Sequence, residues 1–287
     1  MTLPDGFTAG HWTDPIAKTG CTVILCEGAA TAAVHMGGGA PATIQTDIIG
    51  TTSATAILHA VLLTGGSAFG LSAYGGVMRF LEERGVGVAV RDWRVPHVAG
   101  AVIFDLMNGD GQVRPDASSG YAACRVATAD PPEGQVGAGT GATVAKLLGG
   151  RAAGGLAIAS ARAGAATVTA VMVVNALGDI RDSERNEWVA RSAPASGAAA
   201  PGNTTIGAIL TDAKLGREAV RRVASTAHDG LARAIRPAHT DFDGDTIFAL
   251  AHGDKEANPI EVQTAAAEAV EKAIVRAVRL SSGTMRA

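Results

Sequence analysis

An apolar, β-branched run follows directly on a tract of small residues, and this junction limits what the chain can fold into. Residues 192–202 read SAPASGAAAPG, a tract with no period and few side chains to bury, so we expect a mobile surface linker. Residues 205–210 read TIGAIL and precede the polar pair Thr211 and Asp212, which predicts a buried strand. Thr204 therefore stands where a loose linker enters a rigid strand.

A threonine at such a junction is well placed to be a nucleophile. If the bond before Thr204 broke, its hydroxyl and a new α-amine would belong to the same residue. That amine has a reference pKa of roughly 7.7–8.0, so it could serve as the general base for the hydroxyl. An ordinary loop-to-strand junction with Thr in a β-favouring position explains the same residues, and the local sequence leaves both interpretations open.

Composition and charge exclude several classes of protein. The 287 residues are 47% hydrophobic but only 4% aromatic and include 37 glycines, so the core must consist of small and aliphatic side chains. A net charge of −3 offers no basic surface for nucleic acid or for a membrane. Residues 48–78 carry no charged side chain, yet their glycines and hydroxyl residues interrupt any apolar span, so no transmembrane helix is expected.

Cysteine usage indicates the compartment. Cys21, Cys26 and Cys124 form no CxxC motif and leave an odd thiol under any pairing, which favours reduced, buried thiols. The first residues, MTLPDGF, show neither the basic nor the apolar region of a signal peptide. We therefore expect a cytoplasmic protein.

Hydrophobic periodicity predicts strands and long helices in an order typical of one layered α/β or α+β domain. Helices are expected from Ser67 to about Arg84, from Asp116 or Ser118 to about Thr128, and over 217–235 and 259–280. Gly37–Pro41 is expected to be a flexible loop. Strands are predicted at 21–25, 32–35, 57–63, 86–90, 101–106, 155–161, 167–174, 205–210 and 247–251.

Two glycines mark the junction between the strand predicted at 57–63 and the helix after it. Gly65 and Gly66 would expose backbone N–H groups at a helix N-terminus, where they could hold an anion or a substrate carbonyl. Close packing of the strand against the helix is an equally open explanation of both glycines.

An acidic turn follows in the C-terminal part of the chain, where Asp241, Asp243 and Asp245 surround a glycine. An EF-hand calcium loop is excluded, because the positions that need Gly and Glu hold Thr246 and His252. Three carboxylates this close repel each other unless a cation or hydrogen-bond donors lie nearby. The turn is either a solvated acidic turn or a catalytic acid/base pair.

Two further polar residues interrupt apolar surroundings. Lys146 lies among Ala, Val and Leu, so it either snorkels or faces a polar pocket, and Asn175 ends a very apolar strand where a turn residue is expected. The histidines lack the spacing of a zinc site, and the glycines of 137–141 lack that of a dinucleotide loop. No metal or cofactor is therefore expected.

Taken together, two C-terminal motifs resemble a known family. Residues 203–209 (NTTIGAI), followed about 35 residues later by 239–249 (HTDFDGDTIFA), are similar to the self-processing DmpA-type family. That family includes β-aminopeptidases, the L-aminopeptidase/D-amidase-esterase and the nylon-oligomer hydrolase. The resemblance extends over most of the chain, through residues 64–71, 101–105, 137–146 and 173–175.

The resemblance implies a single-domain precursor, 1–287, that cleaves itself between Asn203 and Thr204. The α chain (1–203) and β chain (204–287) would stay together in a four-layer αββα sandwich like that of ornithine acetyltransferase, assembled as a homotetramer. It also implies a role for each site residue. Thr204 would be the nucleophile, Asp243 and Asp245 the acids that position or activate it, Lys146 an active-site group and Asn175 a plausible oxyanion donor.

The implied activity is an N-terminal-nucleophile aminopeptidase or amidase acting on small peptides or amide oligomers. One departure concerns Phe104, where the nylon-oligomer hydrolase has a tyrosine; a phenyl ring cannot donate that hydrogen bond to a substrate. Two alternatives stay open. One is an acyltransferase of the ornithine acetyltransferase type, and the other is an uncleaved scaffold that binds small molecules.

Overall fold

The computed structural model describes residues 1–195 and 202–283, so part of the expected linker, 196–201, lies outside the described residues. The helices are α1 (Tyr74–Glu83), α2 (Ala117–Arg125), α3 (Arg217–Ala234) and α4 (Pro259–Ser281). The longer strands are β1 (Thr8–Asp14), β2 (Thr19–Met36), β4 (Ile57–Thr64), β7 (Val98–Val102), β10 (Gly155–Ala163), β11 (Ala166–Asn175), β14 (Thr204–Ala213) and β16 (Thr246–Lys255). The shorter strands are β3 (Thr43–Ile44), β5 (Val88–Val90), β6 (Trp93–Val95), β8 (Thr143–Val144), β9 (Ala152–Ala153), β12 (Asp179–Asp182), β13 (Glu187–Ala190) and β15 (Ile235–Arg236).

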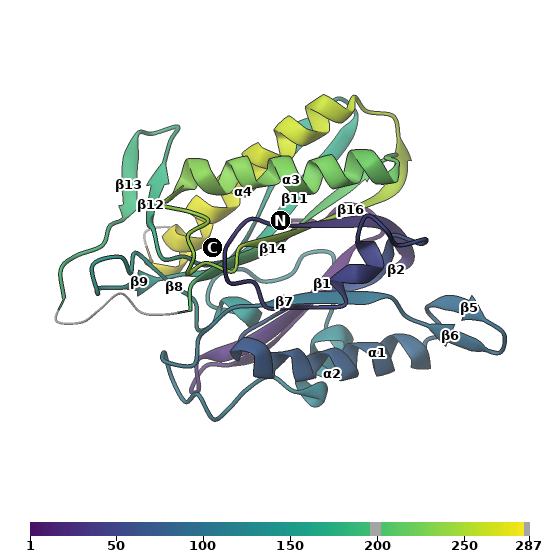
Figure 1. Ribbon diagram of the computed structural model, residues 1–287, viewed down its shortest axis with the longest axis horizontal. Helices are drawn as coiled ribbons and strands as arrows, with labels where there is room; N and C mark the ends of the chain where they lie inside the picture. Colours follow the sequence, from purple (N-terminus) through teal and green to yellow (C-terminus); the bar gives the residue numbers. More distant parts are fainter. Residues whose placement is uncertain (196–201, 284–287) are drawn as a thin grey trace.

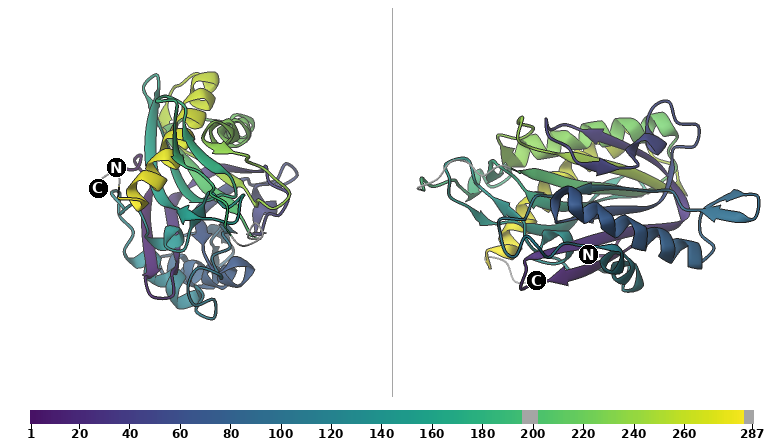
Figure 2. Two further views of the ribbon diagram at one scale, coloured as in Figure 1. Left: turned by 90° about the vertical axis from the view of Figure 1, so that its left-hand side faces the viewer. Right: turned by 60° about the horizontal axis from the view of Figure 1, so that its bottom comes forward.

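One nine-stranded sheet runs in the order β10-β11-β14-β16-β2-β4-β7-β3, with β1 paired to β2. β2 is long enough to pair with strands on both sides of it in this order through different parts of its length. Its residues 31–36 pair with β16, its residues 21–25 pair with β4 and β1, and a register shift between Leu25 and Ala30 separates the two parts. The sheet therefore folds over at β2 into two stacked halves, which lie between two pairs of helices (Figures 1 and 2).

Three buried cores fill the spaces between these four layers. The inner core joins the two sheet halves and includes Ile206, Ala208 and Leu210 of β14. Ile209 points the other way, into the core that α3 and α4 cover, while α1 and α2 cover the outer face of β2, β4 and β7. Strands buried on both faces explain the apolar runs without a polar alternation. The predicted four-layer αββα sandwich is confirmed.

Helix starts follow the local sequence in one case and depart from it in another. Asp116 caps α2 as predicted, since its carboxylate accepts hydrogen bonds from the N–H of Ser119 at 3.0 Å and from its hydroxyl at 3.1 Å. Ser67 does not cap a helix. It begins a 3-10 turn, Ser67–Ala73, that precedes α1, and Gly66 stands at the cap position with φ of 79°.

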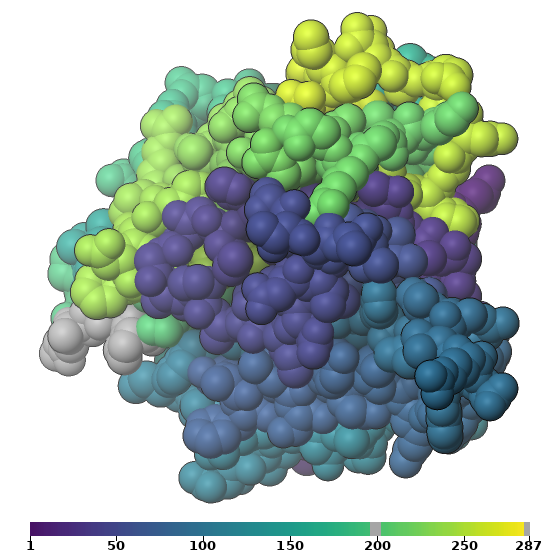
Figure 3. All heavy atoms as spheres, turned by 45° about the vertical axis from the view of Figure 1, so that its right-hand side comes forward, coloured from purple at the N-terminus to yellow at the C-terminus, as the bar shows by residue number. Residues whose placement is uncertain are grey.

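The two ends of the sandwich differ. The short strands β8, β9, β12 and β13 gather at one end, and the β5–β6 hairpin projects from the other (Figure 1). Between α3 and the α1 layer, the surface is covered by N-terminal residues (Figure 3), and Arg217 at the start of α3 donates to the carbonyl of Ser53. No helix within the described ranges is long and apolar enough to cross a membrane.

Candidate active site

Thr204 is the first residue of β14, where two strand pairings fix it. It lies opposite Asn175, the last residue of β11, in the antiparallel pairing of β11 with β14. On the other side β14 runs parallel to β16, so the turn that leads into β16 lies beside the start of β14, and Asn203 bridges to Asp243. The Thr204 side chain is only 6% exposed. The fold thus brings the two C-terminal sequence motifs together at one strand end.

The backbone N–H of Gly244 faces the bond between Asn203 and Thr204. It lies 2.9 Å from the Asn203 carbonyl oxygen and 3.2 Å from Thr204 Oγ1, and the Thr204 hydroxyl itself donates to the same carbonyl. A Cβ added to Gly244 would lie 2.8 Å from Thr204 Oγ1 and 2.7 Å from the Ala40 carbonyl oxygen. Only glycine fits so close to the hydroxyl. The sequence analysis missed this donor, because a backbone N–H has no residue type to mark it.

The two acids flank Gly244 and hold different partners. Asp245 Oδ1 accepts the N–H of Thr205 at 2.8 Å, so it fixes the start of β14. Asp243 Oδ2 accepts the Thr240 N–H at 2.9 Å and the Thr240 hydroxyl at 2.5 Å. Burial, and then the charge of Asp245, raises the pKa of Asp243. Within the described part of the chain, neither carboxylate accepts a hydrogen bond from the Thr204 hydroxyl; each lies one residue from Gly244, whose N–H contacts that hydroxyl.

The loop Gly37–Pro41, expected to be flexible, instead binds the acidic turn through its backbone. Gly37 N–H donates to the Asp245 carbonyl at 2.9 Å, Gly39 N–H to the Thr240 carbonyl at 3.1 Å, and Ala40 N–H to the Asp243 carbonyl at 2.9 Å. Its glycines permit this close approach. The acidic turn is therefore held in place by backbone hydrogen bonds from this loop.

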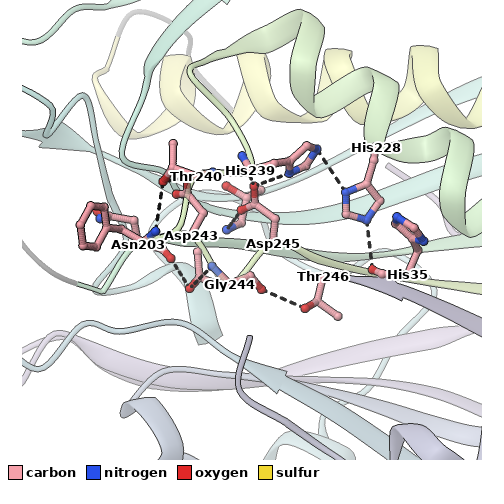
Figure 4. A network of polar contacts seen from close by, with 12 residues as sticks. His35, Asn203, His228, His239, Thr240, Asp243, Gly244, Asp245 and Thr246 are labelled. Carbon is pink, nitrogen blue, oxygen red and sulfur yellow. Dashed lines mark hydrogen bonds and ion pairs between the residues drawn. The ribbon is translucent and has the colours of Figure 1, made fainter. Parts of the chain in front are cut away.

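A chain of histidines extends from Asp245 (Figure 4). His239 Nδ1 lies 2.8 Å from Asp245 Oδ2, and His239 Nε2 lies 3.4 Å from His228 Nδ1. His228 Nε2 lies 3.0 Å from the carbonyl oxygen of His35. Sequence analysis discarded all the histidines because it searched for metal spacing; α3 and β2 bring them together only in the fold. Within the described residues, no group of three potential metal ligands is found.

Lys146 and Asn175 meet on the opposite side of Thr204. The Lys146 ammonium donates to the Asn175 carbonyl at 3.2 Å and to Asn175 Oδ1 at 3.1 Å, and Oδ1 also accepts the Thr143 N–H at 3.0 Å. Burial lowers the pKa of Lys146 to about 7, although Asp243 acts in the opposite direction. A neutral amine is thus accessible near pH 7. The side chain occupies a polar pocket and does not snorkel.

The side-chain amide nitrogen of Asn175 contacts two backbone carbonyl groups, that of Phe104 and that of Gly202, which lies two residues before Thr204. Asn175 Nδ2 lies 3.3 Å from the Phe104 carbonyl oxygen and 3.5 Å from that of Gly202. Phe104 lies beyond the end of β7, which ends at Val102 and not near 106 as predicted. Gly202, with φ of 79°, lies against the Phe104 ring, where a Cβ would approach within 2.3 Å.

Two cavities flank this contact, and both are lined by Phe104 and Gly202. One, of about 270 Å³, contains Lys146 and Arg151. The other, of about 210 Å³, contains Thr204 and Asp241. The nucleophile candidate therefore opens onto space of the size of a small amide group.

The backbone N–H groups of Gly65 and Gly66 already donate hydrogen bonds within the protein. The Gly66 N–H donates to Asp105 Oδ1 at 2.7 Å, and the Gly65 N–H donates to the Gly20 carbonyl at 2.8 Å. Burial raises the pKa of Asp105, whose other oxygen accepts the Thr19 hydroxyl at 2.8 Å. The role of Gly65 and Gly66 in substrate binding stays a prediction, and these hydrogen bonds support the alternative of close packing between strand and helix.

Sequence comparisons agree with the geometry. The profile of peptidase family S58 matches residues 5–286. An uncharacterized aminopeptidase of Mycobacterium bovis is 43% identical over 95% of this chain and 87% of its own. The 6-aminohexanoate-oligomer endohydrolase of Agromyces sp. is 32% identical over 84% of this chain and 71% of its own.

Solved structures show the same architecture. A β-aminopeptidase of Burkholderia sp. superposes with a TM-score of 0.72 at 25% identity, covering 96% of this chain and 84% of its own. The L-aminopeptidase D-Ala-esterase/amidase of Ochrobactrum anthropi, described as a variant of the Ntn hydrolase fold, gives 0.75 at 19% identity, covering 98% and 88%. The second similarity shows the fold alone.

Proposed function

The chain belongs to peptidase family S58 and is an amide hydrolase, and we propose that it activates itself by cleavage between Asn203 and Thr204. The DmpA-type resemblance is thereby confirmed. The observation that carries the proposal is the Gly244 N–H, which donates to the Asn203 carbonyl beside the Thr204 hydroxyl. An acyl shift needs three groups in contact: a hydroxyl that attacks, a carbonyl that is attacked, and a hydrogen-bond donor that stabilises the oxyanion.

The cleavage would proceed in two balanced steps. The Thr204 hydroxyl loses its proton to a base and attacks the Asn203 carbonyl carbon, while the Gly244 N–H stabilises the oxyanion. The C–N bond then breaks, the Thr204 nitrogen takes up a proton, and an ester joins Asn203 to Thr204 Oγ1. Water opens the ester, which leaves a carboxylate on Asn203 and a free hydroxyl and α-amine on Thr204.

In the precursor the Thr204 nitrogen is an amide, so the first step needs another base. We assign it to Lys146, because its pKa is lowered to about 7 and its ammonium contacts the residue paired with Thr204. After cleavage, the α-amine of Thr204 is available as a second base. Asn175, whose amide nitrogen already contacts a backbone carbonyl at this site, is proposed as an oxyanion donor for the substrate.

The α chain (1–203) and β chain (204–287) are proposed to stay together as one domain. β14 lies between β11 of the α chain and β16 of the β chain, and β16 pairs in turn with β2 of the α chain. Three buried cores join the four layers, so a single broken peptide bond removes little of what holds them.

Small peptides or amide oligomers are the proposed substrates, as the printed names of the relatives suggest. The two cavities support a small substrate, with Asp241 on one side of Thr204 and Lys146 and Arg151 on the other. Assembly as a homotetramer is proposed on the family resemblance. A cytoplasmic location is proposed because all three cysteines are buried and unpaired.

Thr204→Ala tests the proposal, and Thr205→Val is its matched control. Among the described residues the buried Thr205 hydroxyl has no hydrogen-bond partner, so a valine of similar shape should fit there. Denaturing gels and mass spectrometry should find a chain that begins at Thr204 in the wild type and in Thr205→Val. The Thr204→Ala protein should stay full length and inactive on peptide p-nitroanilides, β-amino-acid amides and aminohexanoate oligomers. An intact yet active wild-type protein would refute self-activation.

A further inference from the structure

The hydrogen bonds of the histidine chain behind an ionised Asp245 require that one of the two rings, His228 or His239, is charged. The His35 carbonyl only accepts hydrogen bonds, so Nε2 of His228 carries a proton and Nδ1 of a neutral His228 accepts. The Asp245 carboxylate also only accepts. When His228 is neutral, His239 stands between two acceptors with one ring nitrogen toward each, so both of its nitrogens donate. A ring that donates twice is an imidazolium.

The surroundings agree on which ring carries the charge. Burial lowers the pKa of His228 to about 4, which keeps that ring neutral. The hydrogen bond to Asp245 raises the pKa of His239, and the charges of Asp245 and Asp243 act in the same direction. The His35 ring packs edge-on against His228, and burial, followed by the charge of His239, lowers the pKa of His35. The two carboxylates therefore favour the cation on His239, and the two neighbouring histidines stay neutral.

We propose that His239, as a doubly protonated imidazolium, is a positioning residue that holds Asp245 in place for the reaction at Thr204. The inference rests on the proposed function of Thr204. Asp245 Oδ2 accepts both the ring Nδ1–H of His239 at 2.8 Å and its backbone N–H at 3.1 Å, which orients Oδ1 onto the Thr205 N–H. Asp245 in turn fixes the first residues of β14 next to Gly244. His239 does not touch the reacting atoms; it acts through Asp245.

The arrangement has a consequence for the dependence of activity on pH. When His239 loses a proton, one nitrogen can no longer donate, so the ring releases either Asp245 or His228. Activity should therefore fall as pH rises through the pKa of His239. This direction is opposite to that of Lys146 or the Thr204 α-amine, since a general base becomes active as pH rises. The alkaline limb of the profile belongs to His239 and the acidic limb to the base.

Nuclear magnetic resonance of the mature protein with ¹⁵N-labelled histidine measures the charge directly. At pH 6.5, the reference pKa of a histidine, we expect an imidazolium signal with both ring nitrogens protonated, which His239→Gln removes. His228 should give the neutral ring with the proton on Nε2, assigned from His228→Phe. A neutral His239 in the active enzyme at this pH would overturn the inference.

Steady-state kinetics on one amide substrate from pH 5.5 to 9.5 measures the consequence. His239→Gln should lower kcat about tenfold, the scale of one lost charge-assisted hydrogen bond, with little change in KM and without the alkaline limb. His228→Phe removes the acceptor of the second proton, so it should move the alkaline limb to lower pH. His252→Gln is the matched control, since His252 contacts the Ala29 carbonyl on another part of the fold. It should leave the profile unchanged.

A purely structural role for His239 predicts a different pattern, namely a lower thermal transition with an unchanged pH profile, and that result would overturn the proposal. If His239→Gln does not fold, the shift in His228→Phe decides. Thr204→Ala, measured alongside, distinguishes a failure of the proposed function from a failure of the proposed role of His239. An active Thr204→Ala protein defeats the proposed function. An inactive one, together with an unaltered profile in His239→Gln and His228→Phe, defeats only the role of His239.

Discussion

The two sides of Thr204 bury charge in opposite ways. The turn side, residues 239–245, pairs its charges: Asp245 lies against His239, Asp243 accepts two hydrogen bonds from Thr240, and the loop at Gly37–Ala40 braces the backbone. The lysine side holds one buried cation, Lys146, against the neutral carbonyl and amide oxygens of Asn175. On the first side, burial is compensated by opposite charge at Asp245 and by hydrogen bonds at Asp243; on the second side the pKa of Lys146 is lowered.

This difference indicates a division of labour. A charged group that is paired and braced keeps its protonation state and its position near neutral pH, which suits a frame for the nucleophile. A lone buried amine changes its protonation state near pH 7, which suits a group that takes up a proton. We therefore expect substitutions on the turn side to disturb geometry and those on the lysine side to change how the reaction depends on pH.

The largest effect is expected from the acids of the turn side. In Asp245→Asn, one carboxylate oxygen becomes an amide N–H₂ that faces donors from His239 or Thr205, so we expect a drop in kcat of roughly 10²–10⁴, the range of a lost acid or base. Asp243→Asn should lower kcat by the smaller end of this range. The raised pKa of Asp243 favours its neutral form, which a neutral amide replaces more closely. The thermal transition of each variant checks folding. Near-normal kcat in both would identify a solvated acidic turn without a part in the reaction.

Gly244→Ala tests the backbone of the same side. The new Cβ would approach Thr204 Oγ1 and displace the N–H from the Asn203 carbonyl, so self-cleavage should slow by roughly 10²–10³, as for a lost oxyanion donor. The fraction of uncleaved chain over time on denaturing gels measures this rate. Gly216→Ala is the control, because a Cβ there meets nothing within 4 Å. Equal rates in the two variants would remove the Gly244 N–H from the mechanism.

Much of the fold could be predicted from the sequence, because most signals were local. The apolar period of 217–235 and 259–280 predicted α3 and α4, and the runs at 155–161 and 167–174 predicted the strands β10 and β11. The continuous β2 could not be predicted: the sequence indicated two separate strands, 21–25 and 32–35, with Glu27 and Gly28 between them. In the structure these two residues fall where the register of β2 shifts from one sheet half to the other.

The site divides in the same way. Asn203, Thr204, Asp243 and Asp245 stood out because they form compact motifs, and the fold brings them together. The Gly244 N–H, the brace at Gly37–Ala40 and the His228–His239 contact could not be seen. They depend on backbone groups or on residues from distant elements, which carry no local pattern.

On the lysine side, Asn175→Ala should lower kcat by about 10² with little change in KM, if its amide stabilises the transition-state oxyanion. Phe104→Tyr should restore part of the loss in the Asn175→Ala background, since Phe104 lines both cavities and a tyrosine would add a donor there. The four-variant cycle on one amide substrate measures the coupling. Full kcat in Asn175→Ala would leave the oxyanion to backbone N–H groups.

The smallest effect is the dependence of self-cleavage on pH, and it isolates Lys146. Burial lowers the pKa of Lys146 to about 7, so the neutral base is scarce below that pH and prevails above it. Below about pH 7 the rate should rise by close to tenfold per pH unit, and any fall on the alkaline side belongs to His239. Precursor made by cell-free translation and shifted to each pH gives the rate before any Thr204 amine exists. Lys146→Arg keeps the charge but cannot lose it, so its rate should be low and flat. A wild-type rate that does not change between pH 5.5 and 7 would contradict the assignment of Lys146 and move the base to the turn side, where Asp243 and Asp245 are the candidates.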